Sequence, residues 1–269
     1  LIGNTPLIKL KYPSELTGCN IYGKAEFMNP GGSVKDRAAL GIIQDAEEKK
    51  LIEPGGTVVE GTFGNTGIAL TMINNARGYK TIIVMPEAAS LEKRDILKNL
   101  GAELKIVEVK PYKDPGNYQH ISRRLAEELQ AKGEGPVIWA NQFDNTANYE
   151  FHAKTTAKEI YDQLDGKIDG FTCAIGTGGT LAGTSVGLKE LNPNIKIACT
   201  DPQGATMYRY FKDSVLEVTG DPSETEGIGQ ARVTKNVEAC LIDMAYHVTD
   251  KDAFELLYKL IKTEGLFLG

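Results

Sequence analysis

Residues 171–180 read FTCAIGTGGT, a short apolar run that leads into a glycine-rich turn. Residues 57–67 read TVVEGTFGNTG and show the same order, a β-branched run followed by a turn that contains glycines. Apolar residues at helical spacing follow each turn, so both segments predict a strand, a tight turn and a helix. Two such turns far apart in the chain indicate two sheets that share one cleft.

The same alternation of apolar runs and amphipathic stretches extends along the whole chain. It predicts strands over residues 21–27, 57–59, 81–85, 104–109, 137–139, 171–175 and 195–199. It predicts helices over residues 33–50, 65–76, 91–100, 118–130, 146–164 and 180–191, and a last helix with Asp250 as its N-cap. Strands that alternate with helices are typical of α/β proteins with mainly parallel sheets.

The composition of the 269 residues is that of a globular protein, with 41% hydrophobic and 25% charged residues. Thirty Lys and Arg against 36 Asp and Glu leave a net charge of −6, which does not favour nucleic acid or an anionic membrane as partner. No apolar run reaches the roughly 18 residues of a membrane span.

Cysteines and histidines give no sign of a disulfide framework or a metal site. The four cysteines are widely spaced and form no Cys-x-x-Cys pair, which favours reduced thiols in a cytoplasmic protein. His120, His152 and His247 lie far apart, so we expect surface or hydrogen-bonded histidines and no metal.

Lys35 is the candidate nucleophile. It lies within Pro30–Arg37, PGGSVKDR, in the first turn of a predicted helix. The positive end of the helix dipole disfavours an ammonium group there, which favours a neutral amine. The alternative is a solvated lysine paired with Asp36 or Glu26.

The glycine-rich turn Gly176–Thr180 is a candidate phosphate site. Its members are Gly176, Thr177, Gly178, Gly179 and Thr180. Glycines let backbone N–H groups crowd round an anion at the start of a helix, and the two threonines add hydroxyl donors. The turn lacks the Gly-Lys-Ser/Thr ending of a P-loop, so a plain tight turn is the alternative.

Polar residues at two predicted strand ends suit an amino-acid substrate. Asn65 has the amide to donate to a cofactor ring oxygen, and Thr62 and Thr66 with nearby N–H groups, Gly64 among them, suit a carboxylate. Gln142 follows another strand and has the amide to donate to the same carboxylate. The alternatives are simple helix caps for Asn65 and Thr66 and a surface amide for Gln142. A lysine, a polar turn and a glycine-rich loop together suit pyridoxal phosphate.

These three segments resemble the cysteine synthase family, in the tryptophan-synthase-β-like group of pyridoxal-phosphate enzymes known as fold type II. The resemblance covers essentially the whole chain. It extends from LIGNTPL (residues 1–7) through Lys35, the Gly-Asn-Thr-Gly turn, MPE (85–87), GA (101–102) and residues 176–180 to EGIG (226–229). It implies two doubly wound α/β domains with the cofactor in the cleft between them. The expected domains are residues 35–143 and, for the phosphate-binding domain, residues 1–34 plus 144–269.

The resemblance also implies the role of each site residue. Lys35 matches the Schiff-base lysine, and Asn65 matches the residue that binds the ring hydroxyl of the cofactor. Gly176–Thr180 matches the phosphate cup, and Gly227 matches a loop that closes over the cofactor. Thr62, Gly64, Thr66 and Gln142 match positions that bind the substrate carboxylate.

The implied activity is β-replacement. O-acetylserine loses acetate through an aminoacrylate, sulfide adds, and L-cysteine is released, with Lys35 moving the proton at Cα. The family is typically homodimeric and binds the C-terminal tail of serine acetyltransferase, so we expect both here.

Three departures from the family pattern bear on the substrate. Phe63 stands where the family usually has Ser, and Lys110–Pro115, KPYKDP, replaces a Met-Lys-Gly stretch. The family also places a Ser against the pyridine nitrogen shortly after a segment like Gly265–Gly269. The sequence begins at Leu1 and stops at Gly269, so we expect that Ser to lie beyond its end.

Three other readings stay open. Cystathionine β-synthase activity uses the same catalytic set with serine and homocysteine. O-phosphoserine is another donor, whose phosphate Arg232 has the charge to bind. A regulatory protein that keeps pyridoxal phosphate without turnover belongs to a different class, which Phe63 keeps open.

Overall fold

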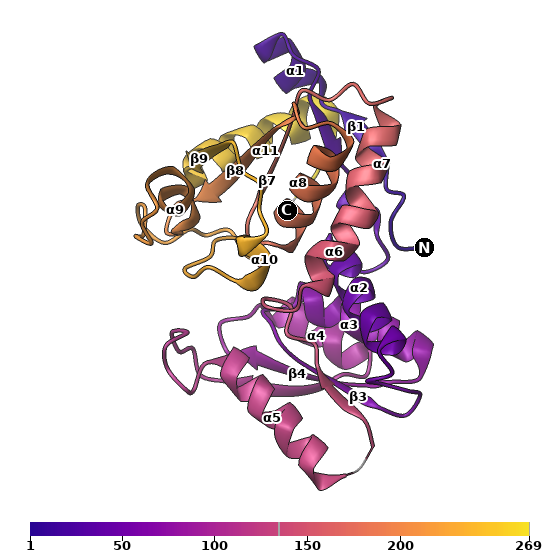
Figure 1. Cartoon of the computed structure of the whole chain (residues 1–269). Helices are drawn as coiled ribbons and strands as arrows, with labels where there is room; N and C mark the ends of the chain where they lie inside the picture. Colours follow the sequence, from indigo (N-terminus) through magenta and orange to yellow (C-terminus); the bar gives the residue numbers. More distant parts are fainter. Residues whose placement is uncertain (134, 269) are drawn as a thin grey trace. The chain divides into compact units, whose positions relative to one another are not determined.

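The computed structural model describes residues 1–133 and 135–268, and it divides into two compact units (Figure 1). Unit 1 consists of Leu1–Ile2 and Phe27–Phe151, and unit 2 of Gly3–Glu26 and His152–Gly269. The expected domain boundaries at residues 35 and 143 therefore differ from the unit boundaries. Residues 27–34 and 144–151 belong to unit 1.

A close helix contact explains the later boundary. A Cβ atom at Gly41 would lie 2.5 Å from Cβ of Phe151 and 2.9 Å from the carbonyl oxygen of Ala147. Only glycine at position 41 lets the two helices approach so closely. The helix that carries Phe151 thus packs in unit 1 up to that residue.

Unit 1 is built on one parallel sheet with strand order β5-β4-β3-β6. Its strands are β3 (Thr57–Gly61), β4 (Lys80–Pro86), β5 (Glu103–Val107) and β6 (Val137–Trp139). Its helices are α2 (Lys35–Glu48), α3 (Asn65–Arg77), α4 (Leu91–Asn99), α5 (Tyr118–Lys132) and α6 (Ala147–Lys154), the last of which crosses into unit 2. Helices α2 and α3 lie on one side of the sheet and α5 on the other (Figure 1). This is the doubly wound arrangement that the family resemblance implies.

The core of unit 1 lies between the sheet and helices α2 and α3. Ile42 and Ile43 from α2 and Leu70 from α3 pack with Val58 from β3, and all four are fully buried or nearly so. Burial of side chains of this size stabilises the fold by about 1.5–3 kcal/mol each. The strand ends that carry the site residues are fixed by this core.

Unit 2 has a second parallel sheet, with strand order β7-β8-β9. Its strands are β7 (Gly170–Ala174), β8 (Lys196–Pro202) and β9 (Met244–Val248). Its helices are α1 (Lys11–Thr17), α7 (Thr156–Gln163), α8 (Gly179–Leu191), α9 (Met207–Asp213), α10 (Lys235–Glu238) and α11 (Asp250–Glu264). A small antiparallel pair, β1 (Leu7–Lys9) and β2 (Tyr22–Lys24), precedes a 3-10 turn at Glu26–Met28.

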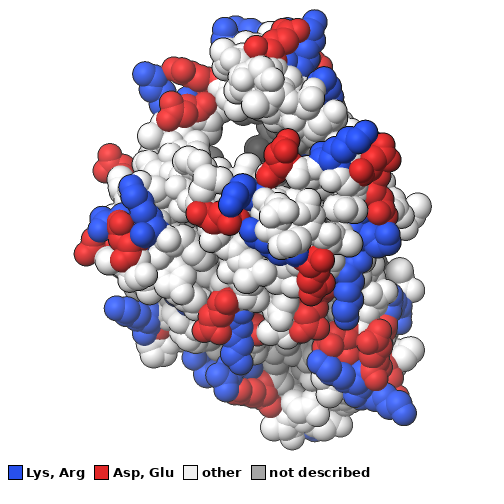
Figure 2. Space-filling model, turned by 45° about the horizontal axis from the view of Figure 1, so that its top comes forward, with Lys and Arg blue, Asp and Glu red and all other residues white. Residues whose placement is uncertain are grey.

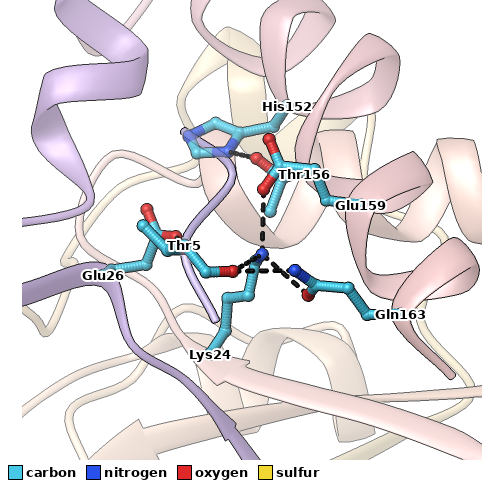
Figure 3. Close-up of polar contacts among 7 residues, drawn as sticks. All are labelled: Thr5, Lys24, Glu26, His152, Thr156, Glu159 and Gln163. Carbon is cyan, nitrogen blue, oxygen red and sulfur yellow. Dashed lines mark hydrogen bonds and ion pairs between the residues drawn. The ribbon is translucent and has the colours of Figure 1, made fainter. Parts of the chain in front are cut away.

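Within unit 2, Lys24 bonds the segment that contains β1 and β2 to helix α7 (Figure 3). Its ammonium group donates to the carbonyl oxygen of Thr5 at 2.5 Å, to the carboxylate of Glu159 at 2.8 Å and to the side chain of Gln163 at 3.0 Å. The ion pair with Glu159 is largely shielded from water, with side-chain exposures of 9% and 14%. Buried charge pairs cost much when one partner is lost, so this contact holds the segment on α7.

The predicted α/β class with mainly parallel sheets is confirmed, and several local predictions need correction. The helix expected over 146–164 is two helices, α6 and α7. The strand expected over 21–27 is the short β2 followed by the 3-10 turn. Thr249, not Asp250, is the N-cap of α11, because its hydroxyl accepts the N–H of Asp252 at 3.2 Å.

The surface carries charges of both signs. On the face shown in Figure 2, lysine and arginine are interspersed with aspartate and glutamate rather than gathered in one patch. No helix within the described residues has the length and apolar character to cross a membrane. Within the same residues all four cysteines are free thiols, with Cys199 buried and Cys19 exposed.

Candidate active site

Lys35 is the first residue of α2, as predicted, and it is half-buried. The turn before it is closed by Asp36, whose carboxylate accepts the backbone N–H of Gly31 at 2.5 Å. A Cβ atom at Gly31 would lie 2.4 Å from that carboxylate, which explains the glycine. The hydroxyl of Ser33 accepts the backbone N–H of Lys35 at 3.2 Å, and the positive end of the α2 dipole lies beside Lys35.

The turn between β3 and α3 also leaves helix N–H groups available. Gly64 is the N-cap, with φ 150°, and a Cβ atom there would lie 2.4 Å from Cδ of Lys93. Neither Asn65 nor Thr66 caps the helix, so that alternative reading is wrong. Within the described residues, the N–H groups of Asn65, Thr66 and Gly67 have no acceptor. Three such donors at a helix start are suited to a carboxylate.

Two polar side chains of the same turn differ in their contacts. The Thr62 hydroxyl accepts the N–H of Gly64 at 3.1 Å and so shapes the turn. The side-chain amide of Asn65 has no hydrogen-bond partner among the described residues, and Asn65 is half-buried. An amide in that situation is suited to bind a ligand atom.

Gln142 joins this turn although it follows β6, the other neighbour of β3. It is 3% exposed, so the surface-amide reading is wrong. Its side-chain carbonyl accepts the hydroxyl of Thr66 at 2.5 Å, and its NH₂ donates to the carbonyl of Gly61 at 3.2 Å. The structure therefore brings Thr62, Thr66 and Gln142 to one end of the unit 1 sheet, where parallel sheets bind ligands.

Glu60 lies beneath this turn and was not identified from the sequence. It is 1% exposed and accepts backbone N–H groups from Gly61 at 2.9 Å and from Gln142 at 3.2 Å. Burial raises the pKa of its carboxyl group to about 8, although the backbone hydrogen bonds from Gln142 and Gly61 oppose the shift. A glutamate inside an apolar run gives no sequence signal beyond its unusual place in a buried strand.

Phe63 lies in the same turn and is 37% exposed. Its ring and the ring of Tyr118 form a T-shaped contact, with ring centroids 5.5 Å apart and planes at 87°. Tyr118 also covers Gly61, since a Cβ atom at Gly61 would lie 2.9 Å from its carbonyl oxygen. Position 63, where the family usually has Ser, thus carries an aromatic ring that contacts Tyr118 at the start of α5.

In unit 2 the turn Gly176–Thr180 leads from β7 into α8. Gly178 is the N-cap with φ 91°, and a Cβ atom there would lie 2.6 Å from Cγ2 of Val237. The N–H groups of Gly178, Thr180 and Leu181 have no acceptor among the described residues. Three N–H donors and the dipole of a helix start suit a phosphate.

Neighbouring segments of unit 2 hold this turn in shape. The hydroxyl of Thr234 donates to the carbonyl of Thr177 at 2.7 Å, and the amide of Gln230 donates to the carbonyl of Gly176 at 3.0 Å. Gly227 is brought to the turn as well, since a Cβ atom at Gly176 would lie 2.5 Å from its carbonyl oxygen. The carbonyl groups of Gly176 and Thr177 are thus occupied, and the hydroxyl of Thr177 accepts the N–H of Gly179 at 3.3 Å.

His152 is the histidine nearest to this turn, and it is fully buried. Its Nδ1 lies 2.8 Å from the hydroxyl of Thr156 (Figure 3), and its Nε2 lies 3.4 Å from the hydroxyl of Thr180. The expectation of a hydrogen-bonded histidine is confirmed for His152. No group of three or more His, Cys, Asp or Glu within the described residues has the geometry to hold a metal ion.

The donor sets of the two units fit pyridoxal phosphate. Unit 2 offers N–H donors and hydroxyls for a phosphate, and unit 1 offers the amine of Lys35 and the amide of Asn65. The start of α3, with Thr66 and Gln142, suits an amino-acid carboxylate. Gly265, which ends α11 with φ 66°, begins the segment expected to precede the pyridine-binding Ser, but Gly269 lies outside the described residues.

Comparison with known proteins agrees with this chemistry. A family model described as pyridoxal-phosphate dependent enzyme matches residues 1–269. Cysteine synthase 1 of Neurospora crassa is 50% identical over the whole chain, which covers 71% of that protein. The structure of an O-ureido-L-serine synthase matches with a TM-score of 0.88 and 34% identity, covering all of this chain and 80% of that one. An O-acetylserine-dependent cystathionine β-synthase from Helicobacter pylori matches with a TM-score of 0.84 and 34% identity, covering all of this chain and 83% of that one.

Proposed function

This chain belongs to the family of pyridoxal-phosphate-dependent enzymes of fold type II, and on that premise we propose that it makes L-cysteine from O-acetylserine and sulfide. The cysteine synthases among its relatives support the reaction type, a β-replacement in which a transferase exchanges acetate for a thiol. Pyridoxal phosphate, when bound, supplies the electron sink that such a reaction needs.

Unit 1 is proposed to hold the reacting amino acid. The amine of Lys35 anchors the cofactor and then holds and moves the proton at Cα of the substrate. The amide of Asn65 donates to the ring hydroxyl of the cofactor. The carboxylate of the substrate is bound by the start of α3 with Thr62, Gly64 and Thr66, and by the amide of Gln142.

Unit 2 is proposed to hold the phosphate. The turn Gly176, Thr177, Gly178, Gly179 and Thr180 binds it through donors that include the N–H groups of Gly178 and Thr180, and Gly227 lies directly against the turn. Because the helix start and the turn donors are fixed in the fold, they bind an anion with little rearrangement.

The single observation that carries the substrate assignment is the pairing of Thr66 with Gln142 at the start of α3. It places a side-chain amide beside three backbone N–H groups that have no acceptor among the described residues. A carboxylate is the group that suits the three N–H donors of this helix start.

One titration tests the proposal. The absorbance of the cofactor-loaded protein is recorded before and after O-acetylserine is added, and sulfide is then supplied while L-cysteine is measured. We expect O-acetylserine to change the spectrum, and cysteine to form on addition of sulfide. A spectrum that O-acetylserine leaves unchanged contradicts the donor assignment, and the assay is then repeated with serine and with O-phosphoserine. If no donor reacts, the chain is a cofactor-bound binding protein.

The aromatic pair Phe63–Tyr118 favours a second candidate function, condensation with a larger thiol as in cystathionine β-synthase. It gives the carboxylate-binding turn an apolar flank that sulfide does not need. Supplying homocysteine in place of sulfide tests this alternative, and preferred formation of cystathionine by kcat/KM would establish it.

The partners and the location are proposals of the same kind. We propose a homodimer in the cytoplasm that binds the tail of serine acetyltransferase, as the family does. The free thiols support a reducing compartment. Sedimentation of the loaded protein tests the dimer, and competition of a serine acetyltransferase tail peptide with O-acetylserine tests the partner.

A further inference from the structure

His152 is a fully buried side chain with a hydroxyl group at each of its ring nitrogens. It lies in the last turn of α6. Its Nδ1 is 2.8 Å from the hydroxyl of Thr156 on α7 (Figure 3), and its Nε2 is 3.4 Å from the hydroxyl of Thr180 on α8. In a neutral histidine one nitrogen carries the proton and the other a lone pair, so the bond made at one nitrogen fixes the role of the other. His152 therefore couples a hydroxyl outside the proposed phosphate turn to one inside it.

Helix packing within unit 2 holds Thr180 beside this ring. Thr180 and Gly187 lie about two turns apart on the same face of α8. A Cβ atom at Gly187 would lie 2.5 Å from Cβ of Ala157 and 2.6 Å from the carbonyl oxygen of Ala153. Ala153 directly follows His152 in the chain. The close approach of α8 at Gly187 thus fixes the same face of α8 against the residues around His152.

Two arrangements of hydrogens fit the two contacts of His152. In the first, Thr180 donates its hydroxyl hydrogen to Nε2, and Nδ1 donates to the oxygen of Thr156. In the second, Thr156 donates to Nδ1, and Nε2 donates to the oxygen of Thr180. A threonine hydroxyl has a single hydrogen to donate. Thr180 therefore has a hydrogen for a bound anion only in the second arrangement.

We propose that His152 is a positioning residue for the cofactor phosphate, which holds the Thr180 hydroxyl as a donor by giving it the hydrogen on Nε2. The inference rests on the proposed phosphate role of Gly176–Thr180 and extends it to a residue that does not touch the phosphate. A hydroxyl that donates to a charged oxygen makes a stronger bond than one that donates to a neutral nitrogen, so a phosphate favours this arrangement. In the opposite arrangement the Thr180 oxygen would turn lone pairs toward the phosphate.

The chemistry of these contacts explains why the residue is a histidine. A buried imidazole needs a partner at each nitrogen, and the hydroxyls of Thr156 and Thr180 supply both. Leucine at position 152 would fill a similar space but would leave the Thr180 oxygen without the donor that orients it. Glutamine keeps an NH₂ group that has the hydrogen to donate to Thr180. The two substitutions therefore separate the donor role of His152 from its packing.

The test compares pyridoxal phosphate with pyridoxal, which lacks the phosphate, by absorbance titration of the cofactor-free full chain. In His152→Leu we expect the Kd for pyridoxal phosphate to rise about tenfold and the Kd for pyridoxal to stay within about twofold. His152→Gln should keep most of the preference for the phosphate. The double variant His152→Leu with Thr180→Val should be no worse than Thr180→Val alone, because His152 acts through Thr180.

Thr184→Val is the matched control for Thr180→Val. Thr184 lies one turn after Thr180 on α8 and is fully buried, and its hydroxyl has no hydrogen-bond partner among the described residues. It should leave both Kd values as in the wild type. A rise in the Kd for pyridoxal phosphate in this control as large as that in Thr180→Val would overturn the inference.

Ring ¹⁵N NMR of the cofactor-loaded wild-type chain keeps the inference testable if His152→Leu does not fold. The chain has three histidines, so substituting His120 and His247 in turn identifies the signals of His152. We expect a proton on Nε2 of His152, and an Nε2 without a proton overturns the inference.

The affinities also separate the two levels of the argument. Equal losses of pyridoxal phosphate and pyridoxal binding in His152→Leu would mean that the histidine only stabilises the fold, which overturns the inference. Unchanged binding of pyridoxal phosphate in that variant overturns it as well. A wild-type chain that binds pyridoxal phosphate no more tightly than pyridoxal instead contradicts the proposed phosphate turn, so the two failures are distinguishable.

Discussion

The hydroxyl of Thr66 donates a 2.5 Å hydrogen bond to the side-chain carbonyl of Gln142, across 76 positions of the sequence. Both residues are buried. Thr66→Val removes the donor, keeps the shape and leaves a buried amide oxygen without it. We expect the KM for O-acetylserine to rise about tenfold and stability to fall by about 1–3 kcal/mol, the cost of an unsatisfied buried group. Steady-state kinetics and thermal unfolding measure the two effects.

Thr71→Val is the control for that variant. Thr71 is as deeply buried on the same helix, but its hydroxyl donates to the carbonyl of Gly67 within the helix. It should change stability and leave KM as in the wild type. Equal KM values in both variants would count against the carboxylate site.

Lys35→Ala should abolish turnover and covalent attachment of the cofactor while the chain stays folded. The physical reason is the loss of the only group in the proposed mechanism that anchors the cofactor and moves the proton. Lys49→Ala, at the other end of α2, is the control and should keep full activity, since Lys49 is exposed and pairs with Asp45 one turn before it. Borohydride reduction followed by mass spectrometry measures attachment. Near-wild-type turnover in Lys35→Ala would contradict the mechanism.

Gly178→Ala should weaken cofactor binding at least tenfold. The new Cβ atom would lie 2.6 Å from Cγ2 and 2.9 Å from the backbone nitrogen of Val237, so the turn must move. Gly133→Ala is the control, because Gly133 also has positive φ, at 71°, but has open space around it. That variant should cost only about 1 kcal/mol of backbone strain. Equilibrium titration of the cofactor gives the affinities, and equal affinities for the two variants would argue against the phosphate turn.

Phe63→Ser should lower the stability of the chain and raise its affinity for O-acetylserine. Loss of the edge contact with Tyr118 should destabilise the chain by about 0.5–1.5 kcal/mol. The added hydroxyl should lower the KM for O-acetylserine, because it supplies a further donor at the carboxylate turn. Phe211→Ser, which breaks the Tyr210–Phe211 pair of unit 2, should destabilise without changing KM. A KM that rises in Phe63→Ser would show that the ring itself binds substrate.

Glu60 should make stability fall as pH rises. Burial raises its pKa from an ordinary 4.5 to about 8, so the folded chain holds a proton that the unfolded chain has lost between these values. Stability therefore declines across about pH 4.5 to 8, and Glu60→Gln should remove that decline. Melting temperatures of both proteins across this range measure the effect, and parallel curves would contradict it.

Asp243 should change stability with pH in the opposite direction to Glu60, and it serves as the comparison. The hydrogen bond from the side chain of Lys189, and a second from the N–H of Ile197, lower the pKa of its carboxyl group. The stability that it contributes is present above its ordinary pKa of 3.8 and is lost as pH falls below it. Asp243→Asn should therefore leave the decline between pH 4.5 and 8 unchanged.

The sequence by itself determined the fold class and the local setting of the candidate nucleophile and phosphate turn. Runs such as Thr57–Val59 and Phe171–Ile175, each followed by glycines, signal strand, turn and helix within a few residues. The predictions that Lys35 lies in the first turn of a helix and that Gly176–Thr180 opens another are confirmed by α2 and α8. The family resemblance then supplied the cofactor, because three short motifs together are far more specific than any one.

Only the tertiary structure decided what surrounds these residues. The bonds of Gln142 to Glu60 and Thr66, and the packing of Phe63 on Tyr118, join residues that are distant in sequence. The local pattern around Gln142 allows a surface amide, and the patterns around Glu60 and Phe63 give no sign of these contacts. Periodicity reports which face of an element is buried, but hydrogen-bond partners and pKa values depend on where separate elements meet. The hydrogen bonds that join Gln142, after β6, to Glu60 in β3 and to Thr66 in α3 lie at such a meeting point, and no stretch of the sequence encodes them alone.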